Sequence, residues 1–405
     1  MKDVVVVGLF NGMSVGRSSL DKSKWNVLRY YSSEIDKYAI QVTDHLYPQD
    51  REYKLGSVLD IDTAKLLAEI REDFPDIPIM LIGGSPCQSF SMAGKRNGAS
   101  TTTNIDVVTL EQYLELKEQK FEFVGQSYLF WEYMRVLTDL QPDHFMLENV
   151  SMVAYWKDIL SDAIGVQPVV INSSLLTAQN RKRLYWVGTK VDGEYTKVEV
   201  NQPEDKGILL KDILLDEVDN KYFYKQSYSL TGKVSGHVAD VYVKGNESIK
   251  RVYSTDSKCP TLTTMQGGHR HPKVLVEAFK PSVRNNMIRE YFDIIKSTKM
   301  IYQCKCTSGF QDNKVGILKS PTLRSGNPYT LGLTKNLLVR RVVPEECEIL
   351  QGVTRNCTAI GWDCTKLKEV KISDSQRYKI LGNSWSEPII VHILNSIQTS
   401  SLLCK

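Results

Sequence analysis

The chain has 405 residues, of which 42% are hydrophobic and 24% are charged, and its formal net charge is +4. This composition is ordinary for a soluble globular protein, and so small a charge does not by itself indicate a nucleic acid partner. A chain of this length usually forms one large domain and a smaller one. The opening segment, MKDVVVVGLF, is too short an apolar run to span a membrane and no cleavage-site pattern follows it, so we expect a cytoplasmic protein.

The eight cysteines are expected to be reduced thiols, because the chain shows no secretory signal. The one close pair, Cys304 and Cys306, lacks the second pair or the histidines that a structural zinc site requires. We therefore expect neither a metal site nor a disulfide framework.

Short apolar runs that end in turn or acidic residues predict the strands of the first part of the chain. They cover residues 4–10, 27–35, 79–82, 145–147 and 185–188. Helix-compatible stretches lie between them, at residues 63–73 and 126–140. This alternation predicts an α/β fold with a doubly wound, mostly parallel sheet.

Ligands of such sheets bind at the carboxyl ends of the strands. Gly12, Glu34, Cys87 and Glu148 each follow an apolar run, so we expect them to gather at one edge of the sheet. From about residue 191 to residue 340 the apolar pieces are shorter and turn residues are frequent, which predicts a second, smaller lobe.

The turn after the first strand contains glycine but lacks both the G-x-G-x-x-G pattern and a P-loop lysine. It still lets backbone N–H groups approach a ligand closely. Glu34 or Asp36, after the next strand, would suit a ribose diol. Taken alone, these features also fit ordinary strand ends.

Cys87 lies on a tight Ser-Pro-Cys-Gln turn after a buried strand, where a thiol can be partly exposed and activated by nearby dipoles or cations. A lone cysteine that merely packs is the commoner case. Glu148 would place a carboxyl group beside this turn and could act as an acid, and a solvated strand-end glutamate is the alternative.

Gln179, Arg181 and Arg183 alternate along a predicted strand and therefore face the same side. Guanidinium groups on a rigid strand can hold an anionic or base-like substrate. A charged edge strand is the alternative interpretation.

Six motifs stand in an order that resembles the cytosine-5 DNA methyltransferases, and together they cover nearly the whole chain. They are Gly8-Leu9-Phe10-Asn11-Gly12, Gly84-Ser85-Pro86-Cys87-Gln88, Glu148-Asn149-Val150, Gln179-x-Arg181-x-Arg183, the segment from Arg340-Arg341 to Leu350-Gln351-Gly352, and Leu381-Gly382-Asn383-Ser384. The sequence at residues 9–13, 33–35 and 84–88 is similar to that of the de novo-type and phage branch of the family.

The resemblance implies transfer of a methyl group from S-adenosylmethionine to carbon 5 of a cytosine that is flipped out of duplex DNA. Cys87 would attack carbon 6 of the ring, and Glu148 would donate toward ring nitrogen 3. Arg181 and Arg183 complete the catalytic set by steadying the base and the thiol site.

The resemblance also implies a site for S-adenosylmethionine. Its residues would be Phe10, Gly12, Glu34, Ile35, Ser57, Val58, Pro86, Asn383 and Ser384. The family usually has Gly-Asp where this chain has Gly56-Ser57, so recognition of the adenine amine would depend on a hydroxyl group without a charge.

A Rossmann-like S-adenosylmethionine-dependent methyltransferase fold with a smaller target-recognition domain is the implied architecture. The catalytic domain would span residues 1–190 and be completed by residues 373–405, with target recognition and a return hinge at 191–372. The residues expected to contact double-stranded DNA are Gln88, Ser89, Ser91, Gln179, Thr261, Leu262, Arg270 and Arg324. We expect a monomer, with a dimer as the alternative.

Three other interpretations stay open on the sequence. One branch of the family methylates transfer RNA, although the large lobe predicted from about residue 191 to residue 340 favours DNA. A catalytically silent nucleic-acid-binding relative would be expected to lack Cys87, Glu148 or Arg181, and all three are present. A nucleotide-dependent oxidoreductase would need the missing glycine motif.

Overall fold

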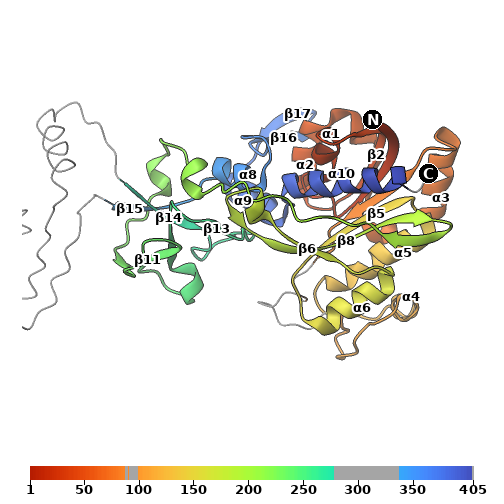
Figure 1. The fold of residues 1–405 in the computed structure, drawn as a ribbon, viewed down its shortest axis with the longest axis horizontal. Helices are drawn as coiled ribbons and strands as arrows, with labels where there is room; N and C mark the ends of the chain where they lie inside the picture. The colour runs from red at the N-terminus through yellow and green to blue at the C-terminus, as the bar shows by residue number, and fades with distance from the viewer. Residues whose placement is uncertain (87–89, 91–98, 278–336, 404–405) are drawn as a thin grey trace, which may run out of the picture.

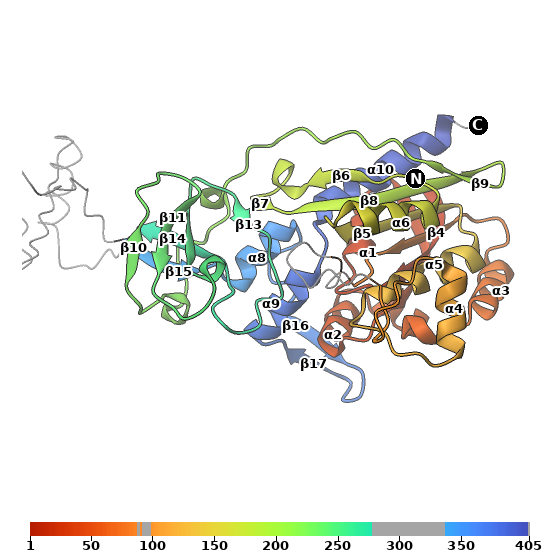
Figure 2. The same ribbon diagram turned by 90° about the horizontal axis from the view of Figure 1, so that it is seen from below.

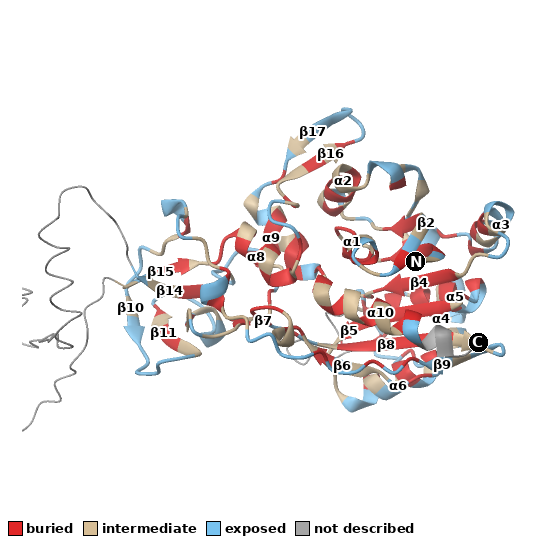
Figure 3. Ribbon diagram, turned by 45° about the horizontal axis from the view of Figure 1, so that its top comes forward, coloured by how far each residue is buried: buried red, intermediate tan, exposed pale blue. Residues whose placement is uncertain are grey.

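The computed structural model describes residues 1–86, 90, 99–277 and 337–403. These residues form a large lobe that holds both termini and a small lobe at the other end of the molecule (Figure 1). Buried residues concentrate in the strands of the large lobe (Figure 3).

An eight-stranded sheet forms the centre of the large lobe, in the order β3-β2-β1-β4-β5-β8-β6, with β9 paired to β8. The first five strands of this order run parallel, whereas β8 is antiparallel to β5, β6 and β9. Their bounds are β1 (Lys2–Leu9), β2 (Trp25–Ser33), β3 (Lys54–Gly56), β4 (Ile79–Gly83), β5 (His144–Val150), β6 (Val169–Asn172), β8 (Lys182–Val191) and β9 (Glu194–Lys197). The expected mostly parallel sheet is confirmed.

Helices cover both faces of this sheet (Figure 2). Side chains alternate along β1, so that Val5 and Val7 face one apolar core and Val4 and Val6 face the other. The first core is closed by α3 (Thr63–Asp73), α4 (Leu110–Glu118), α5 (Phe130–Leu140) and α6 (Ala154–Ile164). The second is closed by α1 (Val15–Asp21) and α10 (Glu387–Leu403).

The C-terminal helix α10 packs on the large lobe although it lies far away in sequence. Trp25 Nε1 donates a hydrogen bond of 3.0 Å to the carbonyl of Leu394, and Gln398 Nε2 donates one of 2.8 Å to the carbonyl of Lys24. The last helix therefore belongs to the same core as the first strands.

The small lobe contains a five-stranded sheet in the order β10-β11-β12-β14-β15. Only β12 and β14 pair parallel in it. The bounds are β10 (Tyr228–Leu230), β11 (His237–Val241), β12 (Arg251–Ser254), β14 (Lys273–Glu277) and β15 (Leu337–Arg341).

Several elements join the lobes. They are α2 (Lys37–Leu46), α8 (Pro344–Gln351), α9 (Asp374–Asn383), the parallel pair β7 (Gln179–Asn180) and β13 (Cys259–Pro260), and the hairpin β16 (Ile360–Asp363) and β17 (Lys368–Lys371). Apolar side chains from α2, α8, α9 and the segment at 259–265 share one core.

Two segments inside the range expected for target recognition, 191–372, contact elements of the large lobe or the elements that join the lobes. The turn at Asp192 and Gly193 returns the chain as β9, and Val198 and Val200 pack in the core of the large lobe. The hairpin of β16 and β17 packs against α2, where a Cβ on Gly361 would lie 2.8 Å from Gln41 Cβ. Pairing with β8 holds β9 on the large sheet, whereas the hairpin of β16 and β17, whose strands pair with each other, is held by its packing on α2.

Candidate active site

The turn after β1 and the end of β2 are held together by one carboxylate. Gly12 N donates to Glu34 Oε2 at 2.7 Å, and the N–H groups of Ile35 and Asp36 donate to Glu34 Oε1 at 2.8 Å each. Phe10 and Gly12 both have a φ of 54°, in the left-handed region. This geometry turns the backbone sharply. Ile35, next to Glu34, is largely exposed.

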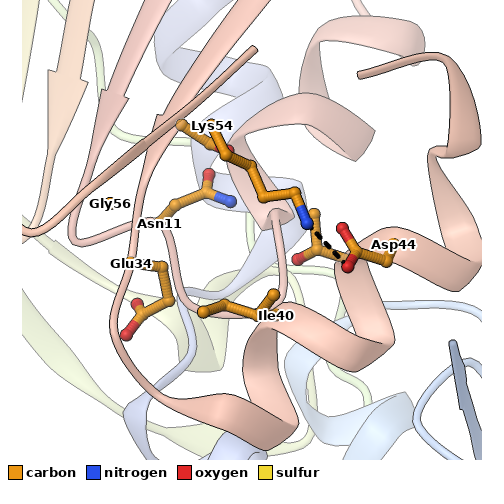
Figure 4. A pocket seen from close by; sticks show the side chains of 8 residues that line it. Asn11, Glu34, Ile40, Asp44, Lys54 and Gly56 are labelled. Atoms are coloured by element: carbon orange, nitrogen blue, oxygen red, sulfur yellow. Dashed lines mark hydrogen bonds and ion pairs between the residues drawn. The ribbon is translucent and has the colours of Figure 1, made fainter. Parts of the chain in front are cut away.

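A pocket lies beside this turn, between β2, β3 and α2 (Figure 4). Its lining residues are Asn11, Ser32, Glu34, Ile40, Thr43, Asp44, Lys54 and Gly56. Sequence reasoning missed the buried Asp44, which pairs with Lys54 Nζ at 2.7 Å. No motif could have revealed this pair, because Asp44 sits within a helix and reads as an ordinary helical acid.

Ser57 and Val58 lie at the same edge, after β3. Ser57 Oγ caps the short 3-10 helix η2 (Val58–Asp60) by accepting a hydrogen bond of 3.2 Å from Leu59 N. Arg135 on α5 donates to the carbonyls of Val58 at 3.0 Å and Ile61 at 3.2 Å. These hydrogen bonds from α5 hold the backbone next to Ser57 in place.

Glu148 at the end of β5 forms an ion pair with Arg183, with 3.0 Å between Glu148 Oε1 and Arg183 Nε. The other carboxylate oxygen faces the start of the turn after β4, since a Cβ on Gly84 would lie 3.1 Å from Glu148 Oε2 and 2.6 Å from Trp385 Nε1. Only glycine fits so close an approach. Asn149 Nδ2 donates to Ser85 Oγ at 3.1 Å and so ties the same turn to β5.

The turn at Gly84 to Pro86 leads directly to Cys87, which lies outside the described residues together with Gln88, Ser89 and Ser91. Pro86 is half-buried. Glu148 and Arg183 thus lie beside the segment that directly precedes Cys87, the expected nucleophile.

Gln179, Arg181 and Arg183 do point inward together, because the residues between them, Asn180 and Lys182, are exposed. The regular strand is interrupted at Arg181, whose side chain is almost completely buried. Its guanidinium donates to the carbonyls of three residues from distant segments, Leu262, Gly382 and Ser384, at 3.2, 3.4 and 2.8 Å.

Gln179 and Leu262 differ from the expectation that they contact DNA, because both side chains are buried. Gln179 Nε2 donates to Gln351 Oε1 and to the carbonyl of Leu350, at 3.1 Å each, while its Oε1 accepts from Leu262 N at 2.9 Å. All of these contacts lie within the protein. Gln179 therefore acts as a brace between the lobes.

Of the other residues expected to contact DNA, Thr261 is half-buried and Arg270 is exposed. Thr261 Oγ1 donates to the carbonyl of Asn180 at 2.6 Å. Arg324 lies outside the described residues.

The return segment after α9 reaches the same edge. Asn383 is exposed and Ser384 is buried. A Cβ on Gly382 would lie 1.9 Å from the carbonyl oxygen of Thr263, so only glycine allows this contact between α9 and the segment that follows β13. Trp385 lies next to Gly16 and Gly84.

In the described part of the chain, no helix has the length and apolarity needed to cross a membrane. Within those same residues, no three His, Cys, Asp or Glu side chains converge as they would around a metal ion.

Residues 4–399 match the family described as C-5 cytosine-specific DNA methylase. The orphan methyltransferase M.SPBetaI of Bacillus phage SPbeta is 27% identical, with 98% of this chain and 97% of that protein covered. The orphan methyltransferase M.Rho11sI of Bacillus phage rho11s is 24% identical over the same shares of both chains. The solved structure of the Entamoeba histolytica methyltransferase EhMeth is similar with a TM-score of 0.56 at 14% identity, covering 99% of both chains. This structural likeness supports the expected fold class.

Proposed function

Because this chain belongs to the family of C-5 cytosine-specific DNA methylases, we propose that it methylates a cytosine flipped out of duplex DNA through a covalent adduct with Cys87. By family it is a DNA cytosine-5 methyltransferase. The pairing of Glu148 with Arg183 at the end of β5, beside the turn that enters Cys87, is the observation that carries the proposed mechanism.

In this mechanism the Cys87 thiolate adds to carbon 6 of the cytosine and forms a carbon–sulfur bond. Glu148, in its protonated form, donates a proton toward ring nitrogen 3, which neutralises the charge that develops there and leaves carbon 5 nucleophilic. After carbon 5 has accepted the methyl group, its proton passes to a base, the carbon–sulfur bond breaks and releases the Cys87 thiolate, and nitrogen 3 returns its proton to Glu148, which restores the aromatic ring.

The two arginines have different tasks in this proposal. Arg183 contacts Glu148 directly and fixes the orientation of its carboxyl group. Arg181 is a positioning residue, because its guanidinium holds the carbonyls of Leu262, Gly382 and Ser384 around the site.

S-adenosylmethionine, when bound, would supply an electrophilic methyl group. The turn with positive φ at Phe10 and Gly12, followed by the Glu34 carboxylate at the end of β2, fits a nucleoside, because that carboxylate can still accept a hydrogen bond from a ribose hydroxyl. Ile35, Ser57 and Val58 would border the adenine. Pro86, Asn383 and Ser384 would complete the site from the other strand ends.

The proposed DNA substrate would lie between the two lobes, with the small lobe recognising the sequence. A cytosine within a duplex cannot present carbon 6 to a thiol, so the base must leave the stack. The unstacking costs a few kcal/mol, which contacts to the phosphate backbone and the flipped base would offset.

The test is transfer of labelled methyl from S-adenosylmethionine to duplex DNA and to transfer RNA, with the modified base identified by mass spectrometry. We expect 5-methylcytosine in DNA from the wild type and none from Cys87→Ala. Cys357→Ala removes a thiol elsewhere and should retain activity. Glu148→Gln should lower kcat about 100-fold or more, since a general acid typically contributes at least that factor.

Product found only in transfer RNA would assign the enzyme to the RNA branch. Labelled DNA from Cys87→Ala would exclude the covalent adduct. No product from the wild type on any cytosine-rich substrate would favour a catalytically silent relative.

A further inference from the structure

Tyr30 on β2 is a buried tyrosine whose hydroxyl group lies against the turn that follows β1. It is 1% exposed, and its hydroxyl donates a hydrogen bond of 2.8 Å to Asn11 Oδ1. A Cβ on Gly8 would lie 2.6 Å from Tyr30 Oη and one on Gly16 would lie 3.0 Å from it, so the backbone before and after the turn closes around this hydroxyl. Because Tyr30 is buried, it can influence a ligand only through its neighbours.

The hydrogen bond from Tyr30 is the first of a chain that ends on the backbone of the turn. Asn11 Nδ2 donates to Ser14 Oγ, which lies 3.1 Å from Thr43 Oγ1 on α2. Thr43 Oγ1 donates in turn to the carbonyl of Gly12 at 3.3 Å. Four side chains from β2, the turn and α2 are therefore linked in one network.

The hydrogen bonds of this chain can run in one direction only. The Thr43 hydroxyl has a single proton, which the Gly12 carbonyl accepts, so Thr43 must accept from Ser14. Ser14 then has no proton left for Asn11, so the amide of Asn11 turns its nitrogen to Ser14 and its oxygen to Tyr30. Tyr30 must therefore be the donor, and burial raises the pKa of its phenol above the ordinary value, which keeps the proton in place.

The turn needs this support because its backbone is strained. Phe10 and Ser14 have φ values of 54° and 62°, in the left-handed region that residues other than glycine rarely adopt. Such residues persist where the surrounding structure fixes them, and they concentrate at ligand sites. Ser14 directly precedes α1, but its hydroxyl does not cap the helix and belongs to the chain instead. Glu34 holds the N–H of Gly12 and Thr43 holds its carbonyl, so the peptide groups on both sides of Gly12 are fixed.

We propose that Tyr30 is a positioning residue of the S-adenosylmethionine site, which holds the turn at residues 10–14 in its binding conformation through the chain that ends on Gly12. This inference rests on the proposed function and deepens it, since it assigns part of the cofactor affinity to a residue that does not touch the cofactor. Asn11 is the link, because it accepts from Tyr30 and also lines the pocket (Figure 4). A turn that is rigid before binding loses less entropy when the ligand binds.

The test compares Tyr30→Phe with Tyr31→Phe, a matched control at the next residue of β2. Tyr31 is 2% exposed, and its hydroxyl donates to Glu69 Oε1 at 2.9 Å on the opposite face of the sheet. Each substitution removes one hydroxyl from a buried tyrosine, but only Tyr30→Phe breaks the chain to Gly12. Titration calorimetry on the full chain measures the dissociation constant of S-adenosylmethionine. We expect binding to weaken about fivefold in Tyr30→Phe, the factor that one hydrogen bond is worth, and to be unchanged in Tyr31→Phe.

Thr43→Val breaks the same chain at its other end, and it gives the same test if Tyr30→Phe does not fold. Valine keeps the shape of threonine and removes the hydroxyl, so binding should weaken by a similar factor. Thr43→Ser keeps the hydroxyl and should recover most of the affinity that Thr43→Val loses. The double variant Tyr30→Phe/Thr43→Val should bind little more weakly than the weaker single variant, because two breaks in one chain have the effect of one.

Wild-type affinity in Tyr30→Phe would overturn the inference. An equal loss in Tyr31→Phe would overturn it too, because the effect would then follow from a weakened β2 and not from the chain. Losses in Tyr30→Phe and Thr43→Val that add up fully in the double variant would show two separate effects and no chain between them. Absence of S-adenosylmethionine binding to the wild type itself would instead contradict the proposed function.

Discussion

The side-chain oxygens of Glu34 and Ser57 accept hydrogen bonds from backbone N–H groups, and the proposed cofactor would bind to the same oxygens. Glu34 accepts from Gly12 and from the next two N–H groups along the chain, and Ser57 accepts from Leu59. A carboxylate has about four acceptor positions and a hydroxyl has two, so each side chain can accept one more donor. Their orientation is therefore set before a ligand binds, which reduces the entropy lost on binding.

Ser57→Asp should strengthen binding of S-adenosylmethionine about fivefold. Aspartate is as good a helix cap as serine, and its charge would strengthen a hydrogen bond from the adenine amine by about 1 kcal/mol. The dissociation constant measured by titration calorimetry checks this, with Ser57→Ala as the control that should bind more weakly. Equal affinities for all three proteins would show that position 57 does not contact the adenine.

The positions of residues that follow a strand could be predicted from the sequence. Glu34 and Glu148 follow apolar runs, and both lie at the carboxyl edge of the sheet. The brace formed by Gln179 could not be predicted, because its partner Gln351 is 172 residues away in the chain. From the neighbouring sequence alone, Gln179 cannot be distinguished from an ordinary polar residue on a strand.

At the scale of elements, helix α5 and the short helix η2 form one unit behind the proposed adenine site. Arg135 of α5 donates to the carbonyls of Val58 and Ile61, while its Nε donates to the fully buried Glu132 at 2.8 Å. Glu132 also accepts from Lys117 at 2.6 Å. A buried charge that is paired on several sides orders the elements that contribute its partners.

Arg135→Lys should weaken binding of S-adenosylmethionine about fivefold or more and leave the KM for DNA unchanged. Lysine can keep the ion pair with Glu132 but cannot reach both carbonyls of the turn, and each lost hydrogen bond costs about 1 kcal/mol. Arg71→Lys is the matched control, because Arg71 also donates to backbone carbonyls, including that of Ile77 at 2.8 Å, at the far end of α3. Similar losses in both variants would refute a specific role for Arg135.

Helices and strands with a strong local sequence pattern could be predicted, whereas the direction of a strand in the sheet could not. Helix α3 occupies residues 63–73 as expected, because Asp62 caps it through Lys65 N and its apolar residues repeat with helical spacing. The run at 185–188 is a strand as expected, but it is antiparallel to β5. Direction depends on the partner strand and on the connection, which leave no pattern within the run itself.

At the scale of the whole molecule, a shared apolar core and a buried ion pair join the lobes. Arg340 of β15 binds Glu346 of α8 through two hydrogen bonds of 2.7 and 2.8 Å, with side chains that are 2% and 0% exposed. Glu346 also accepts from the N–H groups of Val343 and Leu215. The pair thus links the small sheet to the helix that returns the chain to the large lobe.

Arg340→Met should lower the free energy of unfolding by about 3–5 kcal/mol, because it leaves the Glu346 carboxylate buried without its cation. Addition of Glu346→Gln should recover part of that loss, since it removes the buried charge, although its single amide oxygen can accept from only one of the two backbone N–H groups. Urea denaturation of the wild type, the single variant and the double variant measures both effects. If the second substitution instead deepened the loss, the hydrogen bonds that Glu346 accepts from Val343 and Leu215 would matter more to stability than its charge pairing with Arg340.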